Sequence, residues 1–527
     1  MPKKVSKVFL KNEPVNIKVN EELLVSTEFN FIHEPSQTPE FETFQGNLYI
    51  DGQFQAGQRG ERTQRVSPAF GNVVGDYALA HGEDASLAVT AATKAFESGI
   101  WSEQQGAYRS KVLLDIASAI EAELEDFALL ESMETGKPLQ QARDEIETSV
   151  DIWRYAVSLA RNLYGDSYNT LGEQMLGLVL RQPIGVVSVI TPWNFPFLIL
   201  SQKLPFALAA GCTTDVKPAE ITSGTTVKLA NILNRVGMPK GVVNILVGAG
   251  RELGDVLVKD DRVNMVTFTG STGVGQAVAS QAAAGMKKIS MELGGKNPQV
   301  IMPDCDWEAA VDAVVFGVYF NAGECCNSGS RILVHDSIAD DFIAAVKAKT
   351  QSMPLGNPLG EGVKMGAIIH REHLETVLNY VTDAKRAGAK IHLGGERIEH
   401  EKGLYLQPTI VEVNDAGSAV FQDEIFGPVL TVMRFSSFDQ AIQLANQSSF
   451  GLSAAIWSQN IDQCLQFSKK VEAGTVWVNT FMDGFPELPF GGFKQSGLGR
   501  ELGRLSAEEY TELKTVQLHT GSRNNWL

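Results

Sequence analysis

Residues Met265–Gly275 read MVTFTGSTGVG, and the fold is predicted most directly from this stretch. The first five residues have the β-branched and apolar composition of a buried strand. The alanine-rich segment that follows, which ends near Gly285, predicts a helix. The glycines in between allow a ligand to approach the backbone, and a helix N-terminus favours a phosphate. Their spacing differs from G-x-G-x-x-G, so a plain tight turn remains an equal alternative.

The same strand-to-glycine-to-helix order appears in the preceding sequence. Gly185–Ile190 has the pattern of a buried strand, and so has Val243–Val247. Between them Thr222 and Ser223 are suited to cap a helix that ends before Gly237. Strands that alternate with helices predict an α/β fold with parallel strands, whose carboxyl ends form a nucleotide crevice.

Further elements are predicted on either side. Leu48–Phe54 contains Asp51-Gly52 between apolar residues, which is typical of a β-hairpin. A second α/β unit is expected to begin near Leu293. The remaining predicted elements are helices at Ala85–Phe96, Arg109–Ser132, Trp307–Phe320 and Ile338–Met353, and strands at Arg331–Val334, Phe426–Leu430 and Gly474–Val478.

Composition limits the class of protein. The chain has 527 residues, 44% of them hydrophobic and 20% charged, which is enough for two or three globular domains. No stretch has the length of apolar sequence that a membrane helix needs, so no membrane association is expected. The net charge of −17 argues against nucleic acid as a partner.

The five cysteines form an odd, sparse set, which is typical of a reducing compartment and favours a cytoplasmic location. None has metal-ligand spacing, so no metal is expected. The first 45 residues are rich in proline and weakly periodic, and they predict an extension or docking arm rather than a domain.

A pair of cysteines is the first candidate for chemistry. Cys325 and Cys326 lie among glycines and small polar residues, which predicts a loop that can expose a thiol to a substrate. The alternative is two small buried residues.

Two other candidates follow predicted strands. Glu292 comes directly after Lys288–Met291 and could act as a general base, although an exposed strand-end glutamate is the more common case. Asn194 follows Trp193 after another strand, where its amide could stabilise an oxyanion. Without further context Asn194 would be a turn residue and Trp193 a core residue.

Taken together, the motifs resemble those of the aldehyde dehydrogenase superfamily, from about Leu48 to about Thr520. The spacing of 34 residues between Glu292 and Cys326 agrees with the family pattern. The motifs that carry the resemblance are TPWNFP from Thr191, KPAE from Lys217, FTGST from Phe268, MELGGK from Met291, the Cys326 loop, EIFGP from Glu424 and PFGG from Pro489.

The resemblance implies a Rossmann-like NAD-binding domain, an α/β catalytic domain and a small β oligomerisation element. It implies that Cys326 is the nucleophile, that Asn194 forms the oxyanion hole with the Cys326 amide, and that Glu292 activates water. The implied cofactor-binding residues are Ile190, Thr191, Pro192, Trp193, Lys217, Ala219, Glu220, Gly250, Gly254, Gly270, Ser271, Glu424 and Phe426, and the implied substrate-binding residues are Phe195, Cys325, Phe481 and Asp483.

These roles predict oxidation of an aldehyde to the acid through a hemithioacetal and a thioester on Cys326. A carboxylate at Glu220 would accept hydrogen bonds from ribose hydroxyls and repel a 2′-phosphate, so NAD is preferred to NADP. Relatives that transfer the acyl group to CoA generally lack the water-activating glutamate, so Glu292 argues against that alternative. It argues equally against a catalytically silent structural member.

The chain is also somewhat similar to betaine and aminoaldehyde dehydrogenases. Phe481 and Asp483 could accommodate a cationic head group, although Asp483 is equally read as a solvated turn residue beside Gly484. Glu324 replaces the glutamine that is common before the nucleophile, and we expect its charge to raise the pKa of Cys326.

The resemblance further implies a homodimer or homotetramer. It divides the chain into an extension at 1–45, an NAD-binding domain at 46–161 and 184–293, a catalytic domain at 294–495, and oligomerisation segments at 162–183 and 496–527.

Overall fold

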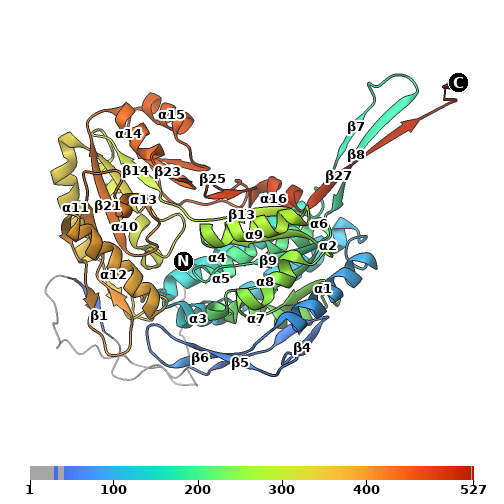
Figure 1. Ribbon diagram of the computed structural model, residues 1–527, viewed down its shortest axis with the longest axis horizontal. Coiled ribbons are helices and arrows are strands. Elements are labelled where there is room, and N and C mark those ends of the chain that lie inside the picture. The colour runs from blue at the N-terminus through green and yellow to red at the C-terminus, as the bar shows by residue number, and fades with distance from the viewer. Residues whose placement is uncertain (1–28, 34–40, 524) are drawn as a thin grey trace, which may run out of the picture.

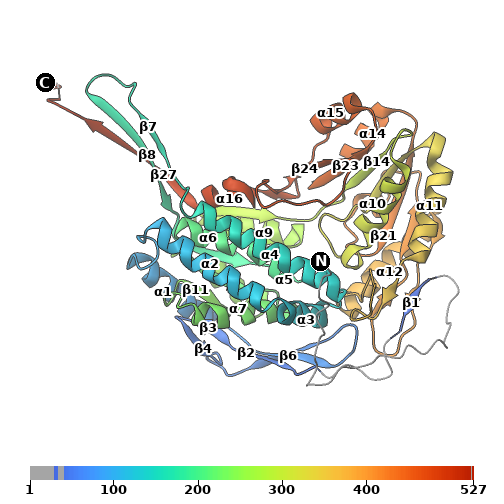
Figure 2. The same cartoon turned by 180° about the vertical axis from the view of Figure 1, so that it is seen from behind.

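A computed structural model describes residues 29–33, 41–523 and 525–527. Two large sheets, each covered by helices, form the body of the molecule (Figures 1 and 2). Most of the predicted docking arm lies outside the described residues. Within its described part, β1 (Phe31–Ile32) pairs in parallel with β16 (Leu355–Gly356) of the same chain.

The first sheet has eight strands in the order β26-β13-β12-β9-β10-β11-β3-β4. Its five central strands run parallel. At the edges, β26 pairs antiparallel with β13, β3 pairs antiparallel with β11, and β4 pairs antiparallel with β3. The predicted hairpin is confirmed, and Asp51 and Gly52 both have positive φ at its turn. The strands are β3 (Leu48–Ile50), β4 (Gln53–Gln55), β9 (Val186–Ile190), β10 (Thr213–Lys217), β11 (Val243–Ile245), β12 (Val263–Thr269), β13 (Lys288–Glu292) and β26 (Gly497–Leu498).

Helices cover both faces of this sheet. The single helix predicted at Arg109–Ser132 is wrong, because the chain forms α2 (Gly106–Ala122) and α3 (Leu124–Thr135) with a break at Glu123. There φ is −110° and ψ is 20°, and the Glu123 carboxylate pairs with Lys228, at 2.9 Å, and with Arg235. The other helices here are α1 (Gly82–Glu97), α4 (Leu139–Leu159), α5 (Pro196–Ser201), α6 (Leu204–Ala210), α7 (Gly224–Arg235), α8 (Gly250–Lys259), α9 (Thr272–Ala284) and α16 (Gly503–Glu509).

The second sheet has seven strands in the order β17-β20-β21-β15-β14-β23-β24, parallel except at the β17 edge. The strand predicted at Phe426–Leu430 begins only at Val429, because Phe426 has φ +59° and cannot lie in a strand. The elements of this unit are β14 (Pro298–Ile301), α10 (Trp307–Tyr319), β15 (Arg331–His335), α11 (Ala339–Ser352), α12 (Arg371–Arg386), β17 (Lys390–Leu393), β20 (Thr409–Glu412), α13 (Ala419–Gln422), β21 (Val429–Phe435), α14 (Phe438–Asn446), β23 (Ser453–Trp457), α15 (Ile461–Lys470) and β24 (Thr475–Val478).

A third sheet, of β7 (Asp166–Tyr168), β8 (Met175–Pro183) and β27 (Thr511–His519), projects from the body as an arm (Figures 1 and 2). Among the described residues, no helix is long and apolar enough to cross a membrane. The smaller strands are β2 (Phe44–Gly46), β5 (Arg62–Val66), β6 (Val73–Ala78), β18 (Arg397–Ile398), β19 (Tyr405–Leu406), β22 (Phe450–Gly451) and β25 (Phe493–Lys494).

The register of the first sheet aligns the candidate site residues. Lys217 lies opposite Ile190, Phe268 also lies opposite Ile190, and Thr269 lies opposite Glu292. These residues end four neighbouring parallel strands, so they form one row at the carboxyl edge of the sheet. A ligand crevice is expected at such an edge.

Candidate active site

The loop that carries the two adjacent cysteines follows α10. Asn321 and Ala322 adopt left-handed conformations, with φ of 49° and 54°, which is costly for alanine. The Asn321 backbone N–H donates to the side-chain oxygen of Gln141 at 3.1 Å, which helps to hold this turn in place. The strained turn therefore sets the direction in which the following residues leave the helix.

The two thiols have different surroundings. Cys325 is 6% exposed and packs against Phe195 and Ile199, whereas Cys326 is partly exposed. The hydrogen bond with the Cys325 thiol and burial raise the pKa of Cys326, and the charges of Glu424 and Glu292 raise it further.

Glu324 was expected to be the charge that raises this pKa, and that expectation is wrong. The Glu324 side chain is buried and accepts a hydrogen bond of 3.0 Å from the Ile369 backbone. The carboxylates that act on Cys326 belong to Glu424 and Glu292 instead.

Glu292 ends β13 and is 3% exposed, so the alternative of an exposed strand-end glutamate is wrong. Among the described residues, neither of its carboxylate oxygens has a hydrogen-bond partner. Burial and the charge of Glu501 raise its pKa well above the usual range. A Cβ on Gly491 would lie 2.8 Å from Glu292 Oε1, so only glycine allows this loop to close over the carboxylate. A carboxylate with a raised pKa is a stronger base than one in water, which suits Glu292 to the role of general base.

Behind Glu292 lies a buried ion pair that the sequence reasoning missed. Lys203 pairs with Glu501 and donates a hydrogen bond of 3.1 Å to Thr267. Both Lys203 and Glu501 are almost completely buried. The signal was present in the sequence, because Lys203 is a lone charge within the apolar stretch Phe195–Ala210, and a buried charge requires a partner.

The Gly294-Gly295 pair joins Glu292 to the nucleophile loop by close packing. Gly295 N–H donates to Glu424 Oε1 at 2.9 Å, and a Cβ on Gly295 would lie 2.6 Å from the Cys326 carbonyl oxygen. Burial raises the pKa of Glu424 to about 7. Asn297, also missed from the sequence, donates to the Cys326 oxygen at 2.7 Å. These contacts hold both Glu424 and the Cys326 backbone against the double glycine.

Asn194 is buried, and both its side chain and its backbone make hydrogen bonds. Its side-chain amide donates to the Glu324 backbone oxygen at 3.0 Å. Its own backbone oxygen accepts hydrogen bonds from Lys137 Nζ at 3.0 Å and from Asn321 Nδ2 at 3.1 Å. The side chain thus reaches from the end of β9 to the loop that carries Cys326.

The predicted cofactor residues lie along the row of strand ends. Lys217 is buried and donates to the Pro218 oxygen at 3.1 Å, whereas Glu220 is exposed. Ser271 is the N-cap residue of α9, and a Cβ on Gly250 or Gly254 of α8 would meet open space. The other predicted positions, at or beside these strand and helix ends, are Ile190, Thr191, Pro192, Ala219 and Gly270.

Several polar atoms on this edge lack partners among the described residues. They are the buried hydroxyl oxygens of Thr191, Thr269 and Thr272, which lie at the ends of β9 and β12 and in the first turn of α9. Buried hydroxyls normally find a partner, so these atoms fit a polar ligand such as a dinucleotide. Trp193 and Phe426 meet edge to face at 5.2 Å, and His373 donates to the Phe426 oxygen at 2.6 Å.

The predicted substrate residues fall into two groups. Phe195 stacks on Phe320 at 5.9 Å beside Cys325. Phe481 is buried in the hydrophobic core around the second sheet, 5.1 Å from the Trp477 ring. Asp483 is exposed, and its carboxylate accepts a hydrogen bond from the Thr480 hydroxyl. Contact of these side chains with substrate stays a prediction.

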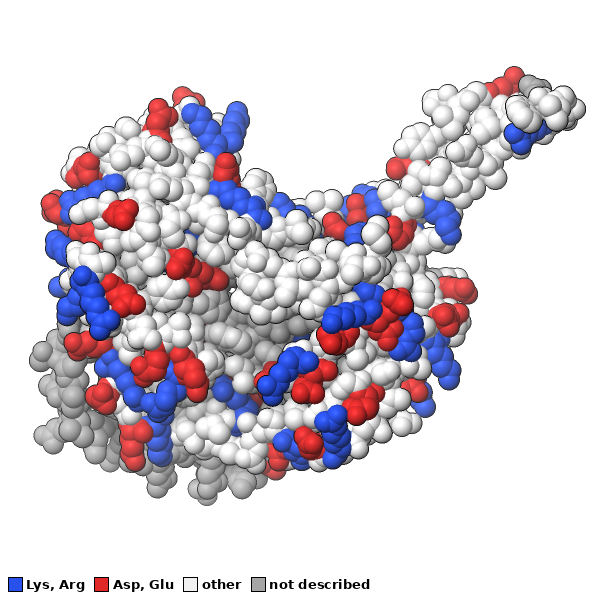
Figure 3. Space-filling model, viewed as in Figure 1, with Lys and Arg blue, Asp and Glu red and all other residues white. Residues whose placement is uncertain are grey.

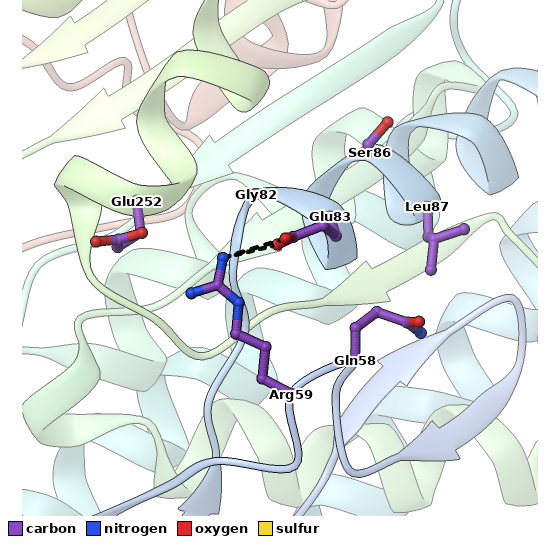
Figure 4. A pocket seen from close by; sticks show the side chains of 7 residues that line it. All are labelled: Gln58, Arg59, Gly82, Glu83, Ser86, Leu87 and Glu252. Atoms are coloured by element: carbon purple, nitrogen blue, oxygen red, sulfur yellow. Dashed lines mark hydrogen bonds and ion pairs between the residues drawn. The ribbon is translucent and has the colours of Figure 1, made fainter.

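A surface hollow of about 720 Å³ lies between the N-terminal turns of α1 and α8 (Figure 4). Arg59 and Glu83 pair at 3.1 Å within it. None of the candidate catalytic residues lines this hollow, so it is separate from the site around Cys326. Its lining residues are Gln58, Arg59, Gly82, Glu83, Ser86, Leu87 and Glu252.

Comparison with known proteins gives the same answer as the geometry. The model of the aldehyde dehydrogenase family matches residues 54–516. Betaine aldehyde dehydrogenase of Bacillus subtilis is 39% identical over 90% of this chain and 97% of its own length. Aminoaldehyde dehydrogenase 1 of Pisum sativum, a peroxisomal protein, is 38% identical over 90% of this chain and 95% of its own length.

Solved structures agree. The NAD-dependent aldehyde dehydrogenase of Sinorhizobium meliloti superimposes with a TM-score of 0.93 at 44% identity, covering 94% of this chain and 99% of that one. Betaine aldehyde dehydrogenase of Staphylococcus aureus in complex with NAD+ has a TM-score of 0.90 at 38% identity, covering 92% and 96%. The resemblance and the fold class predicted from the sequence are therefore confirmed. This chain belongs to the aldehyde dehydrogenase family and is an oxidoreductase that oxidises aldehydes.

Proposed function

We propose that this enzyme oxidises a betaine aldehyde or an aminoaldehyde to the acid, uses NAD in preference to NADP, and employs Cys326 as nucleophile and Glu292 as base. The observation that carries the proposal is the position of Glu292, buried at the carboxyl edge of the first sheet and followed by a double glycine that packs against the Cys326 backbone. Glu424 contacts the same double glycine, because its Oε1 accepts from the Gly295 N–H at 2.9 Å. The substrate class rests on the relatives that are named for these aldehydes.

In the first step the Cys326 thiol releases its proton to water, its sulfur bonds to the aldehyde carbon, and the carbonyl π bond opens to give an alkoxide. The resulting alkoxide accepts hydrogen bonds from the Asn194 amide, which has a second N–H besides the one bound to Glu324, and from the Cys326 backbone. When bound, NAD supplies the acceptor for the hydride that leaves this carbon. A thioester remains on Cys326.

In the second step Glu292 takes a proton from water, whose oxygen bonds to the thioester carbon. The carbon–sulfur bond then breaks, the acid leaves and Cys326 is regenerated. The Lys203–Glu501 pair behind Glu292 sets the charge that this base experiences. Glu292, Cys326 and Asn194 together argue against a CoA-acylating enzyme and against a catalytically silent protein.

The preference for NAD is supported by Glu220, whose carboxylate is exposed at the end of the KPAE motif that begins at Lys217. Its charge would repel a 2′-phosphate, and Lys217 is the only other charged group in the same KPAE motif. The chain could thus hold the adenosine ribose with Lys217 and Glu220 and the nicotinamide ribose with Glu424.

The assembly is a further part of the proposal. The arm of β7, β8 and β27 projects from the body and shows mostly uncharged side chains in the view of Figure 3. Tyr168, Leu180, Leu513 and Leu518 are all exposed on it. Such an apolar arm suits pairing with another copy in a homodimer or homotetramer. We also propose the domain division predicted from the sequence, with boundaries after residues 161, 183, 293 and 495. In that division, segments 162–183 and 496–527 contain the strands of this arm.

A cytoplasmic location is supported by the five cysteines, all of which are free thiols. Some plant relatives are named chloroplastic or peroxisomal, so a location experiment on this chain decides the point.

The activity test is NADH production over betaine, amino, aliphatic, aromatic and acid-semialdehyde substrates. The proposal predicts the highest kcat/KM with an aldehyde that carries a cationic group, and the release of free acid. Uniform activity on uncharged aldehydes would contradict the substrate class, and acyl-CoA formed in the presence of CoA would contradict the hydrolytic step.

A further inference from the structure

A buried lysine lies directly beneath the oxyanion residue. Lys137 follows α3 and is 2% exposed. Its ammonium pairs with Glu131 at 3.0 Å and also with Glu145, and both carboxylates are buried. The same ammonium donates to the Asn194 backbone oxygen at 3.0 Å and lies 4.5 Å from the centre of the Phe195 ring. One charge therefore contacts two consecutive residues of the candidate site.

The hydrogen bonds of Asn194 form a closed ring with Asn321 and Glu324, and Lys137 donates to this ring at the Asn194 oxygen. The Asn194 oxygen accepts from Lys137 and from Asn321 Nδ2, and Asn321 Nδ2 also donates to the Glu324 oxygen at 3.0 Å. The Asn194 side-chain amide donates to that same Glu324 oxygen. The ring thus joins the end of β9 to the loop two residues before Cys326, and a shift of the Asn194 backbone would move the amide that faces the substrate oxygen.

The two carboxylates fix the ammonium in its place. Burial alone would lower the pKa of Lys137, but the charges of Glu131 and Glu145 outweigh it and raise the pKa, so the lysine stays charged. Burial and the neighbouring Glu131 raise the pKa of Glu145 well above its usual range. A buried ion pair contributes little net stability, so stability alone does not account for one beneath the site.

We infer that Lys137 is a positioning residue of the active site, whose ammonium holds the Asn194 backbone and the Phe195 ring so that the Asn194 amide meets the developing oxyanion. The inference rests on the proposed role of Asn194. It assigns no substrate contact to Lys137, because the Asn194 main chain and the Phe195 ring lie against its ammonium.

The test uses the full-length enzyme with Lys137→Met combined with Glu145→Gln, which removes one charge of each sign. Loss of oxyanion stabilisation lowers kcat by about 10²-fold or more, so we expect kcat to fall by roughly that factor. We expect NAD binding to stay unchanged. The rate of Cys326 alkylation by iodoacetamide should also persist, because that displacement develops no oxyanion.

Two comparisons separate positioning from a general structural effect. In a double-mutant cycle with Asn194→Ala, the Lys137 change should cost little extra, since both act through the same amide. The matched control is Lys228→Met, because Lys228 also pairs with a glutamate, Glu123, and lies 5.2 Å over a ring, that of Phe127, yet contacts no site residue. We expect its kcat to equal that of the wild type.

Should the double variant fail to fold, Lys137→Arg carries the test, since it keeps the charge but moves the donor away from the Asn194 oxygen. A kcat near that of the wild type in either variant would overturn the inference, and so would a parallel loss of turnover and alkylation. If Asn194→Ala itself keeps full turnover, the proposed oxyanion assignment fails and the inference fails with it. If Asn194→Ala is inactive while the Lys137 variants are active, only the inference fails.

Discussion

The side-chain amide of Asn194 donates a hydrogen bond of 3.0 Å to the backbone oxygen of Glu324. Asn194 follows a strand of the first sheet, and Glu324 belongs to the loop that carries Cys326 at the second. The amide has two N–H groups, so one can tie the two units together while the other faces the substrate. The oxyanion site is therefore assembled across the boundary between the two sheets.

Replacement of Cys326 and replacement of Cys325 by alanine should have different effects on NADH production. Cys326→Ala should abolish NADH production, because the nucleophile is lost. Cys325→Ala should stay active and should lower the pKa of Cys326, because the hydrogen bond with Cys325 is the largest cause that raises it. The pH dependence of iodoacetamide alkylation measures this pKa, and an unchanged or higher midpoint in Cys325→Ala would contradict the account.

Glu292→Gln should separate the two chemical steps. The thioester still forms, so one equivalent of NADH should appear in a burst. Hydrolysis loses its general base, and the steady rate should fall by about 10²- to 10⁴-fold. Stopped-flow absorbance measures both phases, with Glu487→Gln, at an exposed carboxylate, as a control. Loss of the burst together with the steady rate would argue for a different role.

Glu501→Gln should shift the acid side of the kcat profile. Burial and the charge of Glu501 raise the pKa of Glu292, and Glu292 acts as a base only when it is deprotonated. Removing the Glu501 charge lowers that pKa, so Glu292 stays deprotonated to lower pH. The acid limb of kcat should therefore move to lower pH, and a shift to higher pH would contradict the proposed coupling.

Glu220→Ala should weaken the choice between the two cofactors. The carboxylate no longer repels a 2′-phosphate or binds the ribose hydroxyls, so kcat/KM should rise with NADP and fall with NAD. The ratio of the two values measures the effect. A ratio equal to that of the wild type would show that Glu220 does not determine the choice between NAD and NADP.

The sequence predicted the elements whose patterns are local. The strand-to-helix transition at Met265–Gly275 forms β12 and α9 as expected, and the Asp51-Gly52 hairpin was correct because its turn needs positive φ at both residues. The break at Glu123 was missed, because ion pairs to α7, far along the chain, favour it. The strand expected from Phe426 was wrong because the left-handed backbone there is held by a contact to His373.

For the site, the motifs predicted which residues form it, but not how deeply each is buried or which charged groups lie beside it. Glu292 alone favoured an exposed glutamate, and only the fold shows its burial beside Glu501. Lys137 and Lys203 were not singled out, since the partners that make them significant lie on other helices or at the far end of the chain. The lone charge of Lys203 in an apolar stretch was a local signal that a partner exists, but only the tertiary structure identifies that partner as Glu501.

The central claim is that Cys326 carries the acyl group and Glu292 releases it. The most direct measurement is mass spectrometry of Glu292→Gln, quenched after one turnover with NAD and an aldehyde and digested to peptides. The account predicts the acyl mass on Cys326, at close to one equivalent per NADH formed. An acyl group on Cys325, or NADH formed with no adduct on Cys326, would contradict it.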